Sequence, residues 1–474
     1  MMTAPNAPIL DTADLRGRRA VVLGLARSGV AASRFLADQG ADVVAYDRRT
    51  AAELSESIAA LGGRSVDLAL GIDEAEATAL IAGADLLVTS PSVSARFPTT
   101  DRWLRVALAA AEARGTEIVS EVGLFLRLTR ARILGVTGTK GKTTSTALVA
   151  EMLQAAGIHA ITGGNIGTPL IESAGTLGPD DWAVLELSEL QLPTIDRGAD
   201  VALYTNIGED HLDRHGSVVA YRAVKARLAE LSVTGGRVVL NADDPGCREL
   251  GRRLPPAGVA WYGLEEGTDR VLGATLDADG WLTLHGEHLL LAADVPLPGR
   301  HMLANVLGAS LAAGLAGATA GPIATAIRHF AGVPHRLETI ATRAGVRWIN
   351  DSQATIPVAA IAALEAFEEP IVLIAGGRGK GLDYAAFAEA IAAHCRAAVL
   401  IGESAGELER LIGGRLPVVR APSMADAVAS AAELAEPGDV ALLAPAAASF
   451  DMFVDYAARG DAFRDAVATV AGER

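Results

Sequence analysis

The sequence predicts an α/β protein of three domains. Its 474 residues exceed what a single hydrophobic core covers, and half of them are hydrophobic, so enough apolar surface exists for several cores. Apolar strands alternate with helical stretches along the chain, in three units that begin near residues 19, 132 and 345. We place the boundaries near 128 and 333, which gives domains 1–128, 129–333 and 334–474.

The first domain begins with a strand, a turn, a helix and a second strand. Residues 19–47 read RAVVLGLARSGVAASRFLADQGADVVAYD, with a glycine-containing turn and an acidic end at Asp47. This pattern is typical of a Rossmann-like nucleotide-binding unit. Segments 84–93 and 116–125 continue the rhythm of strands. In dinucleotide-binding proteins an acidic residue at the position of Asp47 binds the ribose, so an NAD-dependent oxidoreductase remains an alternative.

The second domain opens with a glycine-rich loop between a strand and a helix. Residues 135–146 read GVTGTKGKTTST, which lacks the first glycine of the common phosphate-loop pattern. Gly138 and Gly141 allow the backbone N–H groups to approach an anion. Lys142 can reach the β- and γ-phosphates of a nucleotide, and Thr143 places a hydroxyl where Mg²⁺ would lie. The loop therefore predicts a site for nucleotide phosphates at the start of a helix, and the alternative is an ordinary glycine-rich turn between a strand and a helix.

Polar side chains follow the next strands, which we expect at 182–188, 201–207 and 236–244. Glu186 lies at a strand end, where a buried carboxylate gains nothing unless a cation partners it. His211 and Asp213 cluster after the following strand, at the sheet edge where α/β sites form. These residues indicate a candidate site at this edge of the sheet, and the alternatives are an exposed acid at a strand end and a histidine with a structural hydrogen bond.

Lysine is scarce in this chain. Only four of the 41 basic residues are lysines, and these are Lys140, Lys142, Lys225 and Lys380. The position of Lys225 on a predicted helix over 221–231 favours a solvated side chain. The scarcity favours a different reading, in which these lysines perform chemistry that arginine cannot, because an ammonium is a compact charge and a neutral amine can react.

The remaining strands and helices complete the third domain. A long alanine-rich helix near 303–316 precedes a linker at 330–338. We read the alanine-rich segment 306–320 as a buried helix rather than a membrane span, because it contains several glycines and ends near Pro322. The further strands are expected at 345–352, 370–377, 397–403 and 439–445.

Charge and cysteine content limit the partners and the location. The net charge of −16 and the pI of about 5.1 disfavour a nucleic-acid partner, because an acidic surface repels phosphate backbones. Cys247 and Cys395 have no metal-ligand spacing, which fits a reducing compartment. The first twenty residues lack the profile of a signal peptide. We expect a cytoplasmic monomer without a membrane span.

The loop and the segments that follow it resemble one known family in the same order. A strand followed by G-T-x-G-K-T-[TS], then VLELSELQL at 184–192, TNIGEDHLDRHGS at 205–217 and YRAVKARLAEL at 221–231, resembles the Mur ligases. The resemblance implies Rossmann-like N- and C-terminal domains around a central ATPase domain of the phosphate-loop type. It implies ATP and two Mg²⁺ ions as cofactors.

The resemblance also implies roles for individual residues. The catalytic set is Lys142, Glu186, His211 and Lys225, with Lys225 carbamylated. The metal ligands are Thr143, Glu186, His211 and Lys225. The ATP-binding residues are Gly138, Thr139, Lys140, Gly141, Lys142, Thr143, Thr144, Asn305, Arg336 and Asp351. The residues for a uridine diphosphate sugar are Ser28, Arg48, Arg49 and Asn165. The glutamate-binding residues are Thr355, Lys380, Ser449 and Tyr456.

Segments 163–170 and 444–463 resemble the family members that add D-glutamate to UDP-N-acetylmuramoyl-L-alanine in peptidoglycan precursor synthesis. Two positions depart from the pattern of these family members. Gln353 replaces the lysine of D-S-K-A-T, and Tyr456 stands where an apolar aromatic residue is common. An L-glutamate-adding relative is therefore an alternative. An NAD-dependent oxidoreductase leaves 135–146 unexplained, and a nucleotide-sensing scaffold has no use for Glu186, His211 and Lys225 together.

Overall fold

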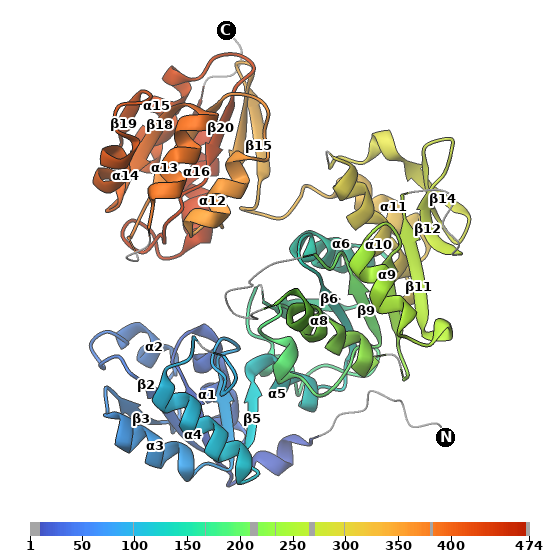
Figure 1. Cartoon of the computed structure of the whole chain (residues 1–474), viewed down its shortest axis with the longest axis vertical. Coiled ribbons are helices and arrows are strands. Elements are labelled where there is room, and N and C mark those ends of the chain that lie inside the picture. Colours follow the sequence, from blue (N-terminus) through green and yellow to red (C-terminus); the bar gives the residue numbers. More distant parts are fainter. Residues whose placement is uncertain are drawn as a thin grey trace. The chain divides into compact units, whose positions relative to one another are not determined.

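Three β-sheets with helices on their faces form the protein (Figure 1). The computed structural model describes residues 10–97, 99–165, 167–208, 217–232, 234–264, 271–297, 299–379 and 383–470. Residue contacts divide the chain into two units, Met1–Phe330 with the first two sheets and Ala331–Arg474 with the third. The predicted α/β class is confirmed, and the boundaries placed at 128 and 333 stay predictions.

The N-terminal sheet is apolar on both faces, as parallel sheets generally are. Ala20 and Val22 pack with helices α1 and α5, whereas Val21 and Leu23 pack with α3 and α4. The strand order is β3-β2-β1-β4-β5, and every pair is parallel. The strands are β1 Arg19–Leu23, β2 Asp42–Asp47, β3 Asp67–Leu70, β4 Leu86–Thr89 and β5 Glu117–Ser120. The helices are α1 Arg27–Asp38, α2 Ser55–Ala60, α3 Glu74–Ala82, α4 Arg102–Ala113 and α5 Glu121–Leu128.

The strand expected over 116–125 is wrong in its second half. Strand β5 ends at Ser120, whose side-chain oxygen accepts a hydrogen bond from the N–H of Gly123 at 3.1 Å. A serine in this position caps a helix and satisfies one of its unpaired donors. The apolar residues that follow therefore continue as helix α5 and not as strand.

The central sheet has nine strands in the order β14-β13-β12-β11-β10-β9-β6-β8-β7. The pairs from β7 to β12 are parallel, and a β12–β13–β14 meander is antiparallel. The strands are β6 Arg132–Thr137, β7 Ala160–Gly164, β8 Trp182–Glu186, β9 Val201–Tyr204, β10 Arg237–Asn241, β11 Val259–Gly263, β12 Leu272–Leu276, β13 Trp281–Leu284 and β14 Glu287–Leu291. The helices are α6 Lys142–Ala155, α8 Val218–Ser232, α9 Pro245–Arg252, α10 Arg300–Leu315 and α11 Ala320–His329.

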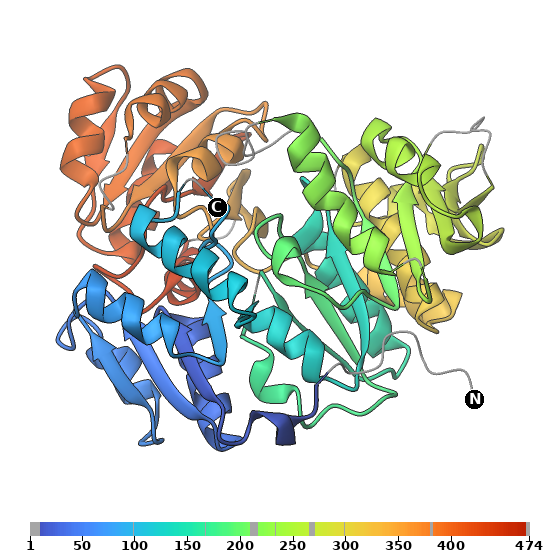
Figure 2. The same ribbon diagram turned by 60° about the horizontal axis from the view of Figure 1, so that its bottom comes forward.

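One hydrophobic core joins the first two sheets. It runs from Val22 and Phe125 in the N-terminal part to Leu185, Leu228 and Leu254 in the central part. Figure 2 shows the same arrangement of sheets and helices from a second direction. Because burial of this shared core stabilises both sheets, residues up to 330 form a single unit.

The third sheet has the order β15-β16-β20-β17-β18-β19, with only the β15–β16 pair antiparallel. Alternate residues of β17 face opposite sides: Leu373 packs with α12, α13 and α14, and Ile374 with α15 and α16. The strands are β15 Glu338–Arg343, β16 Val346–Asn350, β17 Ile371–Gly376, β18 Cys395–Ile401, β19 Val418–Arg420 and β20 Val440–Leu443. The helices are α12 Pro357–Leu364, α13 Ala385–His394, α14 Ala405–Ile412, α15 Met424–Leu434 and α16 Tyr456–Thr469.

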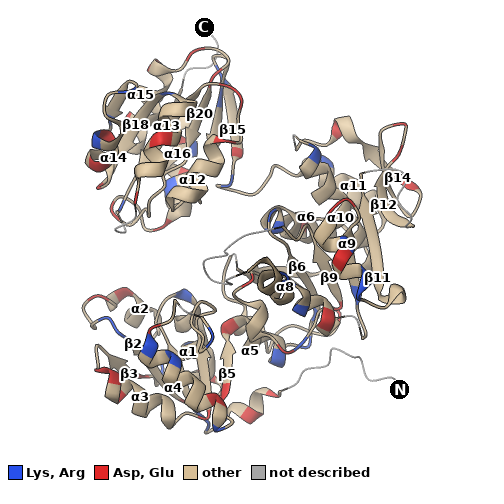
Figure 3. Ribbon diagram, viewed as in Figure 1, with Lys and Arg blue, Asp and Glu red and all other residues tan. Residues whose placement is uncertain are grey.

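Charged residues lie mainly on the helices and loops around each sheet (Figure 3). Strands β9 and β20 contain no charged residue. The short 3₁₀ helices are η1 Thr12–Leu15, η2 Ile171–Ser173, η3 Leu192–Thr194, η4 Pro256–Gly258 and η5 Ala292–Asp294. Among the helices that the structure describes, none combines the length and the apolar character needed to cross a bilayer.

Candidate active site

The phosphate loop joins the end of β6 to the start of α6. Gly138 and Gly141 both have positive φ angles, of 156° and 83°. A Cβ atom on Gly141 would lie 2.5 Å from Oδ1 of Asn305, and one on Gly138 would collide with the hydroxyl of Thr205. Both positions therefore require glycine, for conformation and for space. Asn305, expected near the nucleotide, does lie against the loop.

A segment after β9 clamps this loop. The N–H groups of Thr139 and Lys140 donate to the carbonyl and side-chain oxygens of Asn206, at 3.0 and 2.9 Å. The amide of Asn206 donates in return to the carbonyl of Lys140 at 2.9 Å. Two N–H groups expected to face an anion are thus hydrogen-bonded to Asn206 in this structure. The start of α6, where Gly141 provides no side-chain cap, is the better anion-binding feature.

The lysine of the loop folds back over it. Nζ of Lys142 donates to the carbonyls of Gly138 and Thr139, at 3.1 and 3.0 Å. Thr143, the next residue, is buried, whereas Lys140 is exposed. The ammonium of Lys142 therefore lies directly at the loop.

Glu186 lies at the carboxyl end of β8, between the strand of the phosphate loop and β7. Its register partners are Val136 on β6 and Gly164 on β7. Oε1 accepts a hydrogen bond from the amide of Asn165 at 2.9 Å. Oε2 is buried and has no hydrogen-bond partner among the described residues. An unsatisfied buried carboxylate oxygen is costly unless a cation or water completes it, so this site fits a divalent cation.

The ligand set for such a cation is incomplete in the described residues. No group of three or more His, Cys, Asp and Glu side chains assembles in that part of the chain. Mg²⁺ needs few protein ligands, because it keeps waters and binds nucleotide phosphates. Glu186 and the hydroxyl of Thr143 suit this pattern. His211, expected as a metal ligand, and Asp213, noted in the same segment, lie outside the described residues.

Lys225 lies on α8 and is fully buried. The solvated side chain predicted from its spacing on the helix is therefore a wrong prediction. Nζ donates to the carbonyl of Gly138 at 2.9 Å and to the hydroxyl of Thr137 at 3.3 Å. It lies 4.0 Å from Oε2 of Glu189 and over the ring of Tyr221, 5.5 Å from the ring centre. The scarcity of lysine favoured a functional role for Lys225, and this environment fits such a role. Burying a charged group is costly unless contacts of this kind compensate it.

The N-terminal residues expected to hold a sugar nucleotide lie at one edge of the first sheet. Ser28 begins α1 and is exposed, and Arg48 and Arg49 are exposed after β2. Asp47 accepts from Arg49 at 2.8 Å and from the N–H of Leu25 at 2.9 Å. Burial raises the pKa of Asp47, but these hydrogen bonds outweigh it and bring it to about 2. The carboxylate oxygens of Asp47 are thus already hydrogen-bonded to protein groups. This disfavours the alternative in which Asp47 binds the ribose of NAD.

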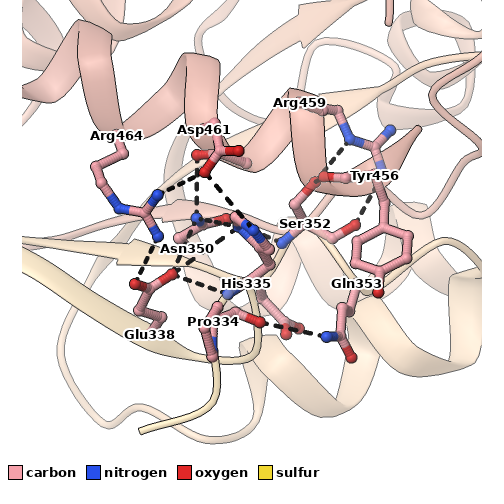
Figure 4. A network of polar contacts seen from close by, with 12 residues as sticks. Pro334, His335, Glu338, Asn350, Ser352, Gln353, Tyr456, Arg459, Asp461 and Arg464 are labelled. Carbon is pink, nitrogen blue, oxygen red and sulfur yellow. Dashed lines mark hydrogen bonds and ion pairs between the residues drawn. The ribbon is translucent and has the colours of Figure 1, made fainter. Parts of the chain in front are cut away.

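In the second unit, Arg459 ties two segments of the sheet edge together (Figure 4). It is buried on α16 and donates to the hydroxyl and carbonyl of Ser352, at 3.0 and 2.9 Å, and to the carbonyl of Ala447 at 3.0 Å. The hydroxyl of Ser352 donates to the carbonyl of Tyr456 at 2.7 Å. Burial lowers the pKa of Arg459 to about 10, although Asp451 opposes this effect.

The contacts of Arg459 bring together the segments that carry the expected glutamate-binding residues. Thr355 follows β16, Ser449 is buried after β20, and Tyr456 begins α16. Lys380 lies outside the described residues. The amide of Gln353 donates to the carbonyl of Pro334 at 3.2 Å, so it is bound to the linker (Figure 4).

Asp351, expected to contact ATP together with Arg336, is buried at the end of β16. Its Oδ1 accepts from the N–H of Leu337 at 3.1 Å. Burial raises the pKa of Asp351 to about 6, opposed by that hydrogen bond and by the charge of Arg336. The neighbouring His335 has a positive φ of 61° and accepts from the amide of Asn350 at 3.1 Å. This network fixes the linker to the sheet.

Comparison with known proteins covers nearly the whole chain. Three family profiles match in order: "Mur ligase MurD-like, N-terminal domain" at 18–120, "Mur ligase middle domain" at 136–313 and "Mur ligase, glutamate ligase domain" at 335–447. A relative from Solibacter usitatus, named UDP-N-acetylmuramoylalanine--D-glutamate ligase, is 40% identical over 454 residues, which are 96% of this chain and 98% of the relative. The chain belongs to the Mur ligase family. A relative of the same name from Marinobacter nauticus is 39% identical, covering 95% of this chain and 98% of its own.

Two solved structures of ligases share the fold. The UDP-N-acetylmuramate-alanine ligase of Thermotoga maritima matches with a TM-score of 0.56 at 18% identity, over 96% of this chain and all of its own. A pseudomurein peptide ligase from Methanothermus fervidus matches with a TM-score of 0.51 at 17% identity and the same coverage. These likenesses confirm the three-domain α/β architecture expected for a Mur ligase.

Two residues of this Mur ligase's site were not among those selected from the sequence. Asn206 clamps the phosphate loop, and Glu189 lies beside the buried Lys225. Asn206 lies in the segment 205–217 that was already of interest, and its position after a strand was an available signal. Glu189 follows Glu186 by three residues in a turn, where an acidic side chain is ordinarily solvated.

Proposed function

We propose that this Mur ligase joins D-glutamate to UDP-N-acetylmuramoyl-L-alanine, with cleavage of ATP, in the synthesis of a peptidoglycan precursor. The names of its full-length relatives support this choice within the family. The structural observation that carries it is the buried Oε2 of Glu186, which has no hydrogen-bond partner among the described residues and lies beside the strand of the phosphate loop. This arrangement suits phosphoryl transfer with a divalent cation and has no use in a hydride-transfer enzyme.

The reaction proceeds in two steps. A carboxylate oxygen of the sugar nucleotide's alanine attacks the γ-phosphorus of ATP, and the bond to the β,γ-bridging oxygen breaks, which yields an acyl phosphate and ADP. The amine of glutamate then attacks the acyl carbon. The tetrahedral intermediate expels phosphate and loses a proton, which leaves the amide.

Protein groups bind the triphosphate and neutralise its charge. The amino end of α6 faces the phosphates with its helix dipole, and the ammonium of Lys142 follows the γ-phosphate as negative charge moves toward the β-phosphate. Glu186 and Thr143 would hold Mg²⁺, which when bound would neutralise part of the phosphate charge. A second Mg²⁺ at His211 follows from the family resemblance and remains part of this proposal.

The remaining assignments place each substrate. We assign the nucleotide further to Gly138, Thr139, Lys140, Gly141, Thr144, Asn305, Arg336 and Asp351. We assign the uridine diphosphate sugar to Ser28, Arg48, Arg49 and Asn165, and glutamate to Thr355, Lys380, Ser449 and Tyr456. The reaction is expected in the cytoplasm, from a monomeric enzyme.

Lys225 is the residue for which resemblance and geometry differ. The resemblance predicts a carbamate on this side chain, which would add an anionic metal ligand. In this structure Nζ donates to Gly138 and lies 4.0 Å from the Glu189 carboxylate, an arrangement suited to an ammonium. Removing bicarbonate and CO₂ from the assay tests the carbamate, because activity then falls only if it forms.

A coupled phosphate-release assay with the sugar nucleotide, ATP and either D- or L-glutamate tests the function. We expect release that depends on D-glutamate and stays near background with L-glutamate. The K142A variant should lose at least about a hundredfold in kcat, the scale of removing one charged group from a transition state. R253A, which removes the exposed arginine that follows the last residue of α9, serves as the control.

Equal or faster turnover with L-glutamate would overturn the stereochemical assignment and favour the L-glutamate-adding alternative. Gln353 gives this outcome a specific reason, because a cation is missing where the glutamate carboxylates are expected. Undiminished phosphate release by K142A would instead reject the phosphate loop as the site of reaction.

A further inference from the structure

The start of helix α5 is joined to the central part of the first unit by polar contacts. The hydroxyl of Ser120 lies 2.7 Å from the hydroxyl of Thr194, in η3. Glu121, the next residue, is buried, and its Oε1 accepts from the N–H of Ile171, in η2, at 2.9 Å. The N–H of Leu170 also hydrogen-bonds to this carboxylate. Because η2 follows β7 and η3 follows β8, α5 holds the chain beyond two strands of the proposed site.

Glu121 has no part in the proposed reaction, yet it is a buried acid. Burial raises the pKa of its carboxyl group, although the N–H groups of Leu170 and Ile171 oppose this effect. Placing an acid inside a protein is costly unless hydrogen bonds compensate it. The two N–H groups provide such compensation and belong to one segment of chain, so the carboxylate fixes the position of that segment.

Leu170 links this segment to Asn165. Its side chain lies against the backbone of Gly163, because a Cβ atom on Gly163 would be 2.4 Å from Cγ of Leu170. Asn165, two residues further on, donates from its N–H to the carbonyl of Glu186 at 2.8 Å and from its side-chain amide to Oε1 of Glu186 at 2.9 Å. The chain is thus anchored to β8 at Asn165 and to α5 at Leu170.

We infer that Glu121 is a positioning residue for the sugar nucleotide, acting through the segment that carries Asn165. A short segment anchored at both ends has few conformations, so Asn165 is ordered before the ligand arrives and binding costs less entropy. Releasing the anchor at Leu170 lets Asn165 leave its place. Because Glu121 is buried, it acts through this segment and not by contact with the ligand.

This inference rests on the proposed function in that Asn165 binds the sugar nucleotide. Its first measurement is the Kd for UDP-N-acetylmuramoyl-L-alanine, obtained by calorimetry without ATP or glutamate. Its second is amide hydrogen exchange in the absence of any ligand. A wild type that binds no sugar nucleotide would reject the proposed function, whereas the exchange would still show whether Glu121 holds the segment.

The E121M variant tests the inference, because methionine keeps the volume of the side chain but has no oxygen to accept from the two N–H groups. The Kd for the sugar nucleotide should rise roughly tenfold, the scale of losing a hydrogen bond to a charged group. The Kd for a fluorescent ATP analogue should stay at the wild-type value. Exchange should accelerate in peptides covering 160–173 and stay unchanged in those covering 371–376 of the second unit.

Two matched variants separate this role from a general loss of stability. E121Q keeps an oxygen for the N–H groups, so its Kd for the sugar nucleotide should lie close to the wild-type value. E151M makes the same replacement as E121M on α6 and should change neither affinity nor exchange.

G163A tests the path through Leu170. Gly163 does not have a positive φ, so the added Cβ brings no backbone strain but must displace Leu170. It should weaken sugar-nucleotide binding as E121M does, and the double variant should be no worse than the worse single one. If E121M does not fold, E121A decides the matter: water can satisfy the N–H groups there but does not hold them, so the Kd should still rise severalfold. Unchanged sugar-nucleotide affinity and exchange in E121M or E121A, an equal loss of affinity for the ATP analogue, or additive losses in the double variant would overturn the inference.

Discussion

Gly141 shows how one residue fixes the geometry of the site. Its φ of 83° disfavours any side chain, and Asn305 occupies the space where a Cβ would stand. G141A must therefore shift the loop or Asn305, and we expect the KM for ATP to rise at least about tenfold. Steady-state kinetics check this prediction.

Gly157 offers a matched control for that substitution. Its φ is 73°, but no atom lies within 4 Å of a Cβ added there. G157A carries the same kind of backbone strain, which costs about 1 kcal/mol of stability. Its KM for ATP should stay at the wild-type value. Equal kinetic losses in the two variants would mean that strain, and not contact with Asn305, matters.

Glu186 allows a direct test of the proposed cation site at the scale of a single oxygen. E186Q keeps the shape and the hydrogen bond with Asn165 but replaces one carboxylate oxygen by an amide donor. We expect Mn²⁺ binding in the presence of ATP, measured by electron paramagnetic resonance, to weaken at least about tenfold. E287Q, an exposed acid on β14, should bind as the wild type does. Unaltered Mn²⁺ binding by E186Q would place the cation elsewhere.

At the scale of elements, Glu121 couples the start of α5 to the start of η2. Its Oε1 accepts from the N–H of Ile171 at 2.9 Å. Burial raises the pKa of Glu121 from 4.5 to about 7, against the opposing hydrogen bonds of Ile171 and Leu170. The folded state therefore holds the proton more tightly than the unfolded state. Stability from this group is complete below about pH 4.5, falls as the pH rises to about 7, and then stays level.

E121Q should remove this loss, because its neutral amide still offers an oxygen to Ile171. Urea unfolding should show E121Q equal to the wild type near pH 4.5 and more stable at pH 8, by about 3 kcal/mol at most. A difference between the two proteins that does not change with pH would contradict the assignment to Glu121.

Sequence patterns predicted the strands and helices that have a simple hydrophobic periodicity. They did not predict features that depend on contacts between residues far apart in the chain. The loop from Gly138 to Lys142 was predictable because glycines and a strand precede a helix. Helix α5 was missed because Ser120 ends the strand and caps the helix without any intervening turn. The burial of Lys225 was missed because its partner Gly138 lies 87 residues earlier in the chain. Periodicity within a helix carries no information on such a partner.

At the scale of the whole molecule, the two units have separate hydrophobic cores and carry different sets of proposed binding residues. The core that joins the first two sheets contains no residue of the third, and the two cores of the third sheet lie entirely within Ala331–Arg474. Each unit therefore buries its own apolar surface. The proposed phosphate and cation residues belong to the first unit, and the proposed glutamate residues belong to the second.

This division predicts what a shortened chain can do. A protein ending at residue 330 should fold and bind a fluorescent ATP analogue, with an affinity lowered by the loss of Arg336 and Asp351. It should show no glutamate-dependent phosphate release, because the amine that consumes the acyl phosphate has no binding site. Adding residues 331–474 as a separate chain should restore little activity, since the linker's effective concentration, in the millimolar range for short flexible linkers, is lost. Glutamate-dependent release by the shortened chain at a rate near that of the full enzyme would show that glutamate binds on the first unit, and would reject the roles proposed for Ser449 and Tyr456.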